Sequence, residues 1–173
     1  MEQKRQDSGI LVPLLKLAVF TLLVPATVAV WLPRLLYPRM MQWAAMQTDG
    51  GGVAGLLLVT LGATGYFWCA GDFVFAGQGT PAPIDHPKVL VTRGLYRYVR
   101  NPMYISVLLV LLGECILFRS WALLRYTSFW FAIVFFFVFL YEEPTLRHKF
   151  GASYEEYCRT VPRWFPRRRS RRL

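Results

Sequence analysis

The residues best suited to chemistry are charged side chains placed at the ends of apolar runs or inside them. Glu142 and Glu143 form an adjacent carboxylate pair at the end of the last apolar run, and Pro144 follows directly. Proline suits the first turn of a helix, so we expect the helix to break there and to leave a polar concavity beside the pair. The alternative is a solvated helix end in which Glu143 pairs with Arg147, four residues on.

A second group opens the third apolar run, where Arg100, Asn101 and Pro102 are consecutive. Asn is a favoured N-cap and Pro a favoured first helical residue, so the amides of Met103 and Tyr104 should face the preceding loop. A helix N-terminus beside an arginine attracts a carboxylate or phosphate. An ordinary capped helix start with a basic flank is the alternative.

A third candidate, Glu114, lies within an apolar run. Ionisable groups are costly inside a membrane, so each one is a candidate for function. We expect Glu114 either to tie the neighbouring helices together through Arg119 or Arg125, or to line a polar cavity between helices.

The cysteines suggest packing rather than chemistry. Cys69, Cys115 and Cys158 are odd in number and widely spaced, which gives neither a disulfide framework nor zinc-ligand spacing. We therefore interpret them as small apolar fillers and expect no metal site.

Four apolar runs must position the candidate residues. The chain has 173 residues, of which 55% are hydrophobic and only 17% charged, whereas soluble domains carry about a quarter charged residues. Apolar runs cover residues 10–32, 53–70, 103–118 and 121–141, and the first two are long enough to span a bilayer. Glycines in the second run should let a neighbouring helix approach closely. The sequence predicts an all-α polytopic membrane protein with about four transmembrane helices, a tight hairpin between the last two, and a C-terminal interfacial helical segment.

The charges predict the orientation of these helices. There are 20 Lys and Arg against 10 Asp and Glu, a net charge of +10. Fifteen of the twenty cations fall on one side of the four runs, near the N-terminus, in a loop over 71–100, and from Arg147 onward. Basic loops stay in the cytoplasm, so we expect an integral membrane protein with cytoplasmic termini, in the inner membrane if bacterial or the endoplasmic reticulum if eukaryotic. The basic tail should lie on anionic lipid, and we expect no nucleic-acid partner.

Taken in order, these pieces resemble the isoprenylcysteine carboxyl methyltransferase and phospholipid methyltransferase superfamily of membrane enzymes. The resemblance covers residues 90–166. It rests on G-x-Y-x-x-x-R-N-P-x-Y from Gly94 to Tyr104, on Gly113-Glu114, and on E-E-x-x-L-x-x-x-F-G-x-x-Y-x-x-Y from Glu142 to Tyr157. Asn101 stands where the family frequently has His, so acid–base chemistry by an imidazole is absent here.

The resemblance implies S-adenosylmethionine as cofactor, bound at the cytoplasmic face. It divides the chain into an N-terminal membrane region (1–89), a methyltransferase-like region (90–166) and a polybasic tail (167–173). We expect Arg100, Glu114 and Glu142 to be the catalytic residues. The implied cofactor contacts are Tyr96, Arg100, Asn101, Pro102, Tyr104, Glu142, Glu143, Tyr154 and Tyr157.

The implied function is methyl transfer to an amphiphilic small molecule, a lipid-like or prenylated substrate taken from among the membrane lipids. Carboxyl O-methylation of the isoprenylcysteine type is preferred. A carboxylate nucleophile would need no general base. N-methylation of a phospholipid amine is the alternative, with Glu114 or Glu142 as proton acceptor. A small membrane scaffold or lipid-binding subunit is the non-enzymatic alternative. The sequence leaves the oligomeric state open.

Overall fold

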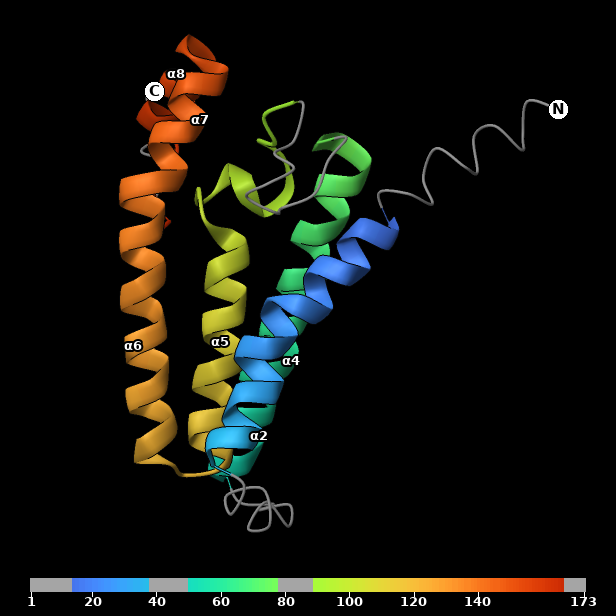
Figure 1. The fold of residues 1–173 in the computed structure, drawn as a ribbon, viewed down its shortest axis with the longest axis vertical. Helices are drawn as coiled ribbons and strands as arrows, with labels where there is room; N and C mark the ends of the chain where they lie inside the picture. The colour runs from blue at the N-terminus through green and yellow to red at the C-terminus, as the bar shows by residue number, and fades with distance from the viewer. Residues whose placement is uncertain (1–13, 38–49, 78–88, 167–173) are drawn as a thin grey trace, which may run out of the picture.

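The computed structural model describes residues 14–37, 50–77 and 89–166, and within these ranges every regular element is a helix. The helices form an elongated bundle (Figure 1). Three are long and apolar enough to cross a membrane: Leu14–Leu36, Gly50–Phe75 and Trp121–Phe150. A shorter apolar helix, α5 (Pro102–Leu117), lies between the last two. The predicted all-α polytopic membrane fold is thus confirmed, whereas the basic tail lies outside the described residues.

The first long helix is fixed to the bundle near its end. It passes through a π-helical turn, η1 (Thr27–Trp31), into α2 (Leu32–Leu36). Pro33 follows this turn and has no amide hydrogen. The Val28 carbonyl, five residues earlier, therefore lacks the donor that a π-helical turn would give it. The Tyr126 hydroxyl, from the last long helix, donates to the Val28 carbonyl over 2.8 Å. A side chain far along the chain therefore satisfies a backbone group that proline leaves unpaired.

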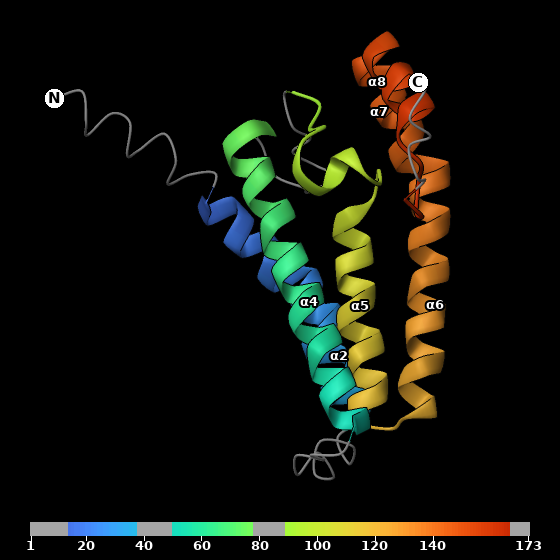
Figure 2. The same cartoon turned by 180° about the vertical axis from the view of Figure 1, so that it is seen from behind.

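Helices α4 (Gly50–Asp72) and α5 are in close backbone contact, seen from behind in Figure 2. A Cβ atom built on Gly55 would lie 2.9 Å from the Gly113 carbonyl oxygen, and one on Gly113 would lie 2.7 Å from the Gly55 carbonyl oxygen. Only glycine fits at such distances, which is a common way for membrane helices to approach. The glycines therefore serve the packing that the sequence predicted.

The tight hairpin between α5 and α6 (Trp121–Phe137) is also present. Arg119 turns the chain with a φ of 48°. Ser120 caps α6, its hydroxyl accepting a hydrogen bond from the Leu123 amide over 3.1 Å. These two residues are sufficient to reverse the chain at this end of the bundle.

The expected helix break at Pro144 is wrong. Helix α6 continues through a π-helical turn, η4 (Val138–Glu142), directly into α7 (Glu143–Phe150). In this turn the Glu143 amide donates to the Val138 carbonyl, five residues back. The wider turn accommodates Pro144 without interrupting the helix, because the missing amide falls where the hydrogen-bond register already changes.

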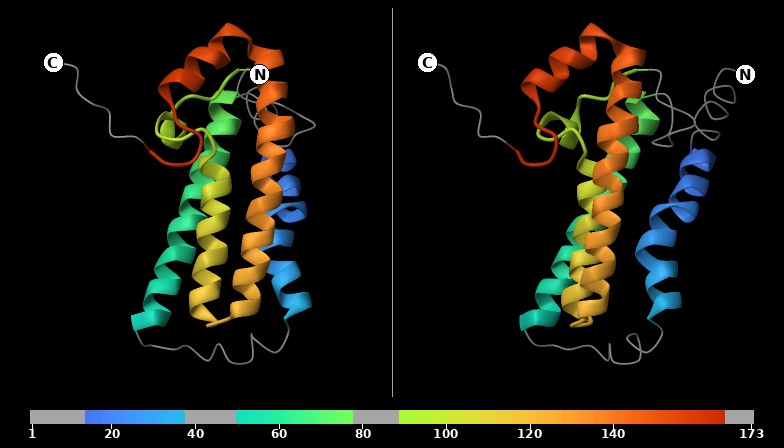
Figure 3. Two further views of the ribbon diagram at one scale, coloured as in Figure 1. Left: turned by 90° about the vertical axis from the view of Figure 1, so that its left-hand side faces the viewer. Right: turned by 60° about the vertical axis from the view of Figure 1, so that its left-hand side comes forward.

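The chain turns instead at Gly151, which has a φ of 52° and ends α7. Helix α8 (Ala152–Thr160) follows. Together α7 and α8 arch from the end of α6 over the start of α5, as Figure 3 shows from two sides. They cover the end of the bundle at which the residues around Arg100 lie.

The second long helix extends further than expected. Residues 73–77 continue α4 as a π-helical turn, so Asp72 is buried at a helix end and not in a loop. Its Oδ1 atom accepts a hydrogen bond from Arg93 Nε over 2.9 Å. Arg93 directly precedes a 3₁₀ turn, η3 (Gly94–Arg97). Asp72 thereby anchors the loop that leads to Arg100.

We expect Gly94→Ala to lower the melting temperature in detergent and to weaken ligand binding at the Arg100 end. Gly94 has a φ of 57°, and an added Cβ would meet the Asp72 carboxylate and the Trp68 indole. The left-handed conformation alone costs an alanine about 1 kcal/mol. Gly71→Ala is the matched control, because the added Cβ would lie 4.0 Å from its nearest neighbour among the described residues, Phe75. Equal melting temperatures for the two variants would contradict this prediction.

Candidate functional site

A pocket lies where the loop before α5, the first turn of α5, the end of α6 and α8 meet. The first long helix contributes Phe20 to its wall. Pro102, one of the nine residues that the resemblance assigns to the cofactor, is buried at the first position of α5. The other eight all line the pocket: Tyr96, Arg100, Asn101, Tyr104, Glu142, Glu143, Tyr154 and Tyr157.

Glu143 is a buried carboxylate to which the arginines of this site bind, and 4% of its surface is exposed. Arg163 donates to both of its oxygens, from Nε to Oε1 and from Nη2 to Oε2, each over 2.7 Å. Arg100 Nη1 lies 3.0 Å from Oε1. The alternative in which Glu143 pairs with Arg147 is wrong, since Arg147 Nε lies 3.6 Å from Glu155 Oε1 instead. Glu143 is therefore held by two guanidinium groups.

Arg100 connects three parts of the site. Its backbone amide donates to the Pro162 carbonyl over 2.9 Å, and its Nη1 also lies 2.8 Å from Cys158 Sγ. Cys158 is thus a hydrogen-bond acceptor and more than a filler of space. The Nε atom of Arg100 is buried without a hydrogen-bond partner among the described residues. A buried charged donor left without an acceptor is costly, so Nε is available for a ligand.

Glu142 faces the pocket from the last residue of the π-helical turn η4. Tyr104, in the first turn of α5, donates its hydroxyl to Glu142 Oε2 over 2.7 Å. Among the described residues, only this oxygen of Glu142 has a hydrogen bond. Glu142 therefore keeps acceptor capacity, whereas both oxygens of Glu143 are already used.

Two buried tyrosines of α8, Tyr154 and Tyr157, close the pocket. Their ring centroids lie 6.1 Å apart. The Tyr157 hydroxyl donates to the Tyr96 carbonyl over 2.7 Å. Burial raises the pKa of Tyr96, Tyr154 and Tyr157 above their usual value. All three phenols therefore stay protonated, and able to donate, at neutral pH.

We expect Tyr157→Phe to destabilise the protein by about 1–3 kcal/mol, because the buried Tyr96 carbonyl loses its donor. The measurement is thermal or denaturant unfolding in detergent. Tyr98→Phe is the matched control, since the Tyr98 side chain is largely exposed. If both variants unfold alike, the hydrogen bond does not hold α8 to the loop.

Residues 161–165, here called the strap, follow α8 and return along the outside of the site. Asn101 was expected to cap α5 with its side chain, but it makes no such bond. Its Nδ2 donates instead to the Arg163 carbonyl over 3.2 Å. Trp164 stacks on Phe135 of α6, with ring centroids 6.3 Å apart and planes 20° apart. The strap therefore joins the start of α5 to α6.

Sequence reasoning missed the ion pair between Arg163 and Glu143. The two hydrogen bonds raise the pKa of the Arg163 guanidinium above its usual value. The Arg163 guanidinium therefore stays charged within this pair at neutral pH. No local pattern reveals it, because its members lie 20 residues apart on different elements.

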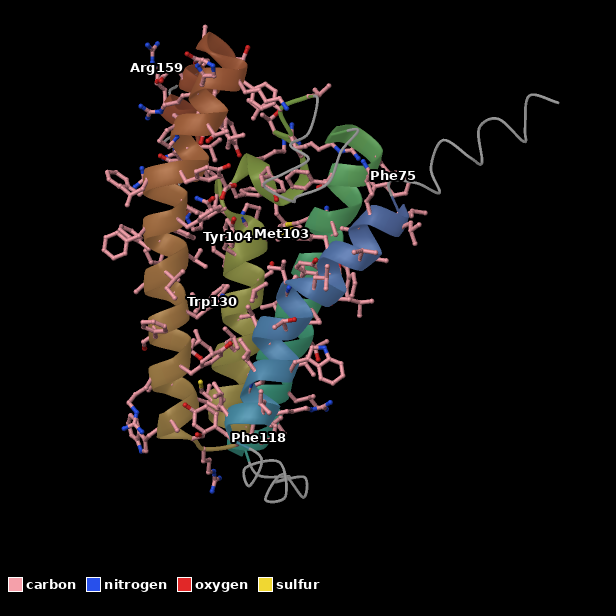
Figure 4. All side chains as sticks on the ribbon, in the orientation of Figure 1. Phe75, Met103, Tyr104, Phe118, Trp130 and Arg159 are labelled. Atoms are coloured by element: carbon pink, nitrogen blue, oxygen red, sulfur yellow. The ribbon has the colours of Figure 1, made fainter. Side chains whose placement is uncertain are left out.

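Glu114 does not join this site. Tyr104 and Phe118 mark opposite ends of α5 in Figure 4, and Glu114 lies one turn from the Phe118 end. Ten residues of helix separate Glu114 from Tyr104, a rise of about 15 Å. Glu114 lines a separate cavity with Arg34, and no hydrogen bond or ion pair to Arg119 or Arg125 is among its contacts. The cavity interpretation therefore agrees with the structure, and catalysis at the Arg100 end by Glu114 does not.

The fold and the pocket define a polytopic membrane protein with a charged site at one end of its helical bundle. The chain belongs to the phospholipid methyltransferase family, whose model matches residues 51–153. This family is part of the superfamily that the motifs resemble, so that resemblance is confirmed.

Two curated relatives match the same length of chain. The cobalt-zinc-cadmium resistance protein CzcN of Cupriavidus metallidurans is 32% identical over 113 residues, 65% of this chain and 48% of the relative. The nickel-cobalt-cadmium resistance protein NccN of Alcaligenes xylosoxydans xylosoxydans is 28% identical over 113 residues, with the same coverage of 65% and 48%. The chain thus spans about half the length of these relatives.

Proposed function

We propose that the protein transfers a methyl group from S-adenosylmethionine to an amphiphile drawn from the membrane. The observation that carries the proposal is the pocket at the start of α5. It gathers eight of the residues that the family resemblance assigns to the cofactor, from segments up to 61 residues apart. Membership of the phospholipid methyltransferase family supports the same chemistry.

The donors and acceptors of the pocket fit S-adenosylmethionine. The buried and unpartnered Nε of Arg100 suits a carboxylate, and so do the amides at the start of α5. Glu142 retains an oxygen for an ammonium group or a ribose diol. When bound, the cofactor supplies an electrophilic methyl group on its sulfonium. The protein has mainly to hold the acceptor in line with this methyl group and to exclude water.

The apolar part of the pocket suits a lipid-like acceptor. Phe20, Phe137 and Tyr141 extend its wall along the first and last long helices, towards the depth of the membrane. A substrate with an apolar tail could reach the charged end from the side while its polar group meets Glu142. Arg100 and Glu142 would then touch both ligands, as residues of the catalytic site.

The acceptor group determines what Glu142 must do. If the methyl acceptor is a carboxylate, the preferred case, no proton has to be removed. Glu142 then only binds and orients the ligands. An amine acceptor must lose a proton, and Glu142 is the one proposed proton acceptor that lies in the pocket, since Glu114 lies elsewhere. The two cases therefore differ in how strongly Glu142→Gln affects turnover.

The charge asymmetry supports a cytoplasmic location for the pocket. Within the described residues, Arg93, Arg97, Arg100, Arg147 and Arg163 belong to the loops and helices at this end. Basic segments remain on the cytoplasmic side, where S-adenosylmethionine is available. The division into a membrane region, a methyltransferase region and a basic tail is part of the same proposal.

The test is to incubate membranes containing the protein with methyl-labelled S-adenosylmethionine and to extract the lipids. We expect label in the lipid fraction, and none from membranes that lack the protein. Mild alkali then distinguishes the acceptors, because a methyl ester releases its label as methanol and an N-methyl group does not. A protein that neither binds the cofactor saturably nor labels any lipid would be a scaffold or lipid-binding subunit instead.

A further inference from the structure

A second cavity lies at the opposite end of the bundle from the methyltransferase pocket. Its volume is about 130 Å³, enough for several water-sized groups. It lies between the end of the first long helix, the last turn of α5 and the first turn of α6. Its walls are formed by Val30, Pro33, Arg34, Tyr37, Glu114, Phe118 and Leu123.

The carboxylate in this cavity is incompletely satisfied. Glu114 Oε2 is buried and has no hydrogen-bond partner among the described residues. The cavity walls beside the Glu114 side chain are largely apolar. The Glu114 backbone carbonyl accepts a hydrogen bond from the Phe118 amide over 2.9 Å. A buried carboxylate oxygen without a donor is costly, and more so in a membrane protein. A ligand with an N–H donor would remove that cost.

The second charge in the cavity narrows the choice of ligand. Arg34 lines the same cavity as Glu114, so the cavity offers a carboxylate oxygen to a cation and a guanidinium group to an anion. A simple cation or a simple anion would meet only one of them. Apolar side chains beside these elements, including Leu35, Leu36 and Ile116, are exposed and can contact acyl chains. The complementary molecule is a lipid with a zwitterionic headgroup.

We propose that this cavity binds the headgroup of a phospholipid carrying a primary ammonium, with the ammonium on Glu114 and the phosphate on Arg34. Glu114 lies about 15 Å along α5 from Tyr104 of the methyltransferase pocket. The lipid bound here is therefore an accessory ligand of the opposite leaflet and not the methyl acceptor. The proposal stands whether or not the protein transfers methyl groups.

The test is native mass spectrometry of the delipidated protein in detergent, without S-adenosylmethionine. Phosphatidylethanolamine, phosphatidylcholine and phosphatidylglycerol are each added at matched concentrations. We expect phosphatidylethanolamine to be retained best. The quaternary ammonium of phosphatidylcholine has no N–H to donate, and phosphatidylglycerol has no cation.

The variants locate the binding. Glu114→Gln and Arg34→Gln should each lower retention of phosphatidylethanolamine roughly fivefold or more. Arg125→Gln is the matched control, because it removes an exposed arginine at the same end of the bundle and outside the cavity. Equal retention of the three lipids, or unchanged retention in folded Glu114→Gln, would overturn the proposal. If Glu114→Gln fails to fold, retention of phosphatidylethanolamine by the Arg34→Gln variant decides.

Discussion

Arg100→Ala is expected to lower the affinity for S-adenosylmethionine roughly tenfold to hundredfold, and to reduce methyl transfer at least as much. The substitution removes the buried donor Nε, which has no partner among the described residues. It also leaves Glu143 with Arg163 as its remaining cation. Arg100→Lys should rescue little, because an ammonium cannot reproduce the planar fork of a guanidinium.

The measurement is equilibrium binding of the cofactor to purified protein in detergent, with a melting curve for each variant. Arg97→Ala is the matched control, since Arg97 is exposed in the same loop and does not line the pocket. We expect its affinity to equal that of the wild type. Unchanged affinity in a folded Arg100→Ala protein would refute the assignment of Arg100 to the cofactor.

Gly62→Ala is expected to destabilise the bundle by about 3 kcal/mol, a large effect for one methyl group. The added Cβ would lie 2.5 Å from the Ser106 carbonyl oxygen and 2.8 Å from the Val110 amide nitrogen. Both are backbone atoms inside α5, so no side chain can move aside. The two helices would have to separate, which also loosens the contacts of Gly55 and Gly113 nearby.

Gly50→Ala provides the comparison, because an added Cβ there meets no atom of the described residues within 4 Å. Both substitutions replace glycine by the better helix former. The difference between their melting temperatures in detergent therefore reports the packing of α4 on α5. A Gly62→Ala protein as stable as Gly50→Ala would mean that this contact contributes little.

The fold was predictable because its signals are local. Apolar runs gave the long helices, and the Arg119-Ser120 pair between two runs gave the hairpin. The start of α5 followed from Asn101 and Pro102. The role of the Asn101 side chain did not follow, because its partner, the Arg163 carbonyl, comes from a strap that lies 62 residues away in sequence.

The residues that line the site were more predictable than the contacts between them. The motif order brought Arg100, Glu142 and Glu143 together, although the rule for pairs four residues apart pointed Glu143 to the wrong arginine. Glu114 was grouped with them, yet the rise of a helix already separates it from Tyr104. The number of charged residues also could not reveal that Arg163 pairs with Glu143, because this ion pair depends on the path that the strap takes after α8.

The π-helical turn η4 makes the tolerance of Pro144 depend on chain length. It fits one more residue into its turn than an α-helix would. Deleting any single residue from Val138–Glu142 would leave an α-helical turn, in which the Pro144 ring clashes with the carbonyl four residues before it and kinks the helix beside Glu143. Natural variation in this stretch should therefore allow changes of residue type more readily than insertions or deletions.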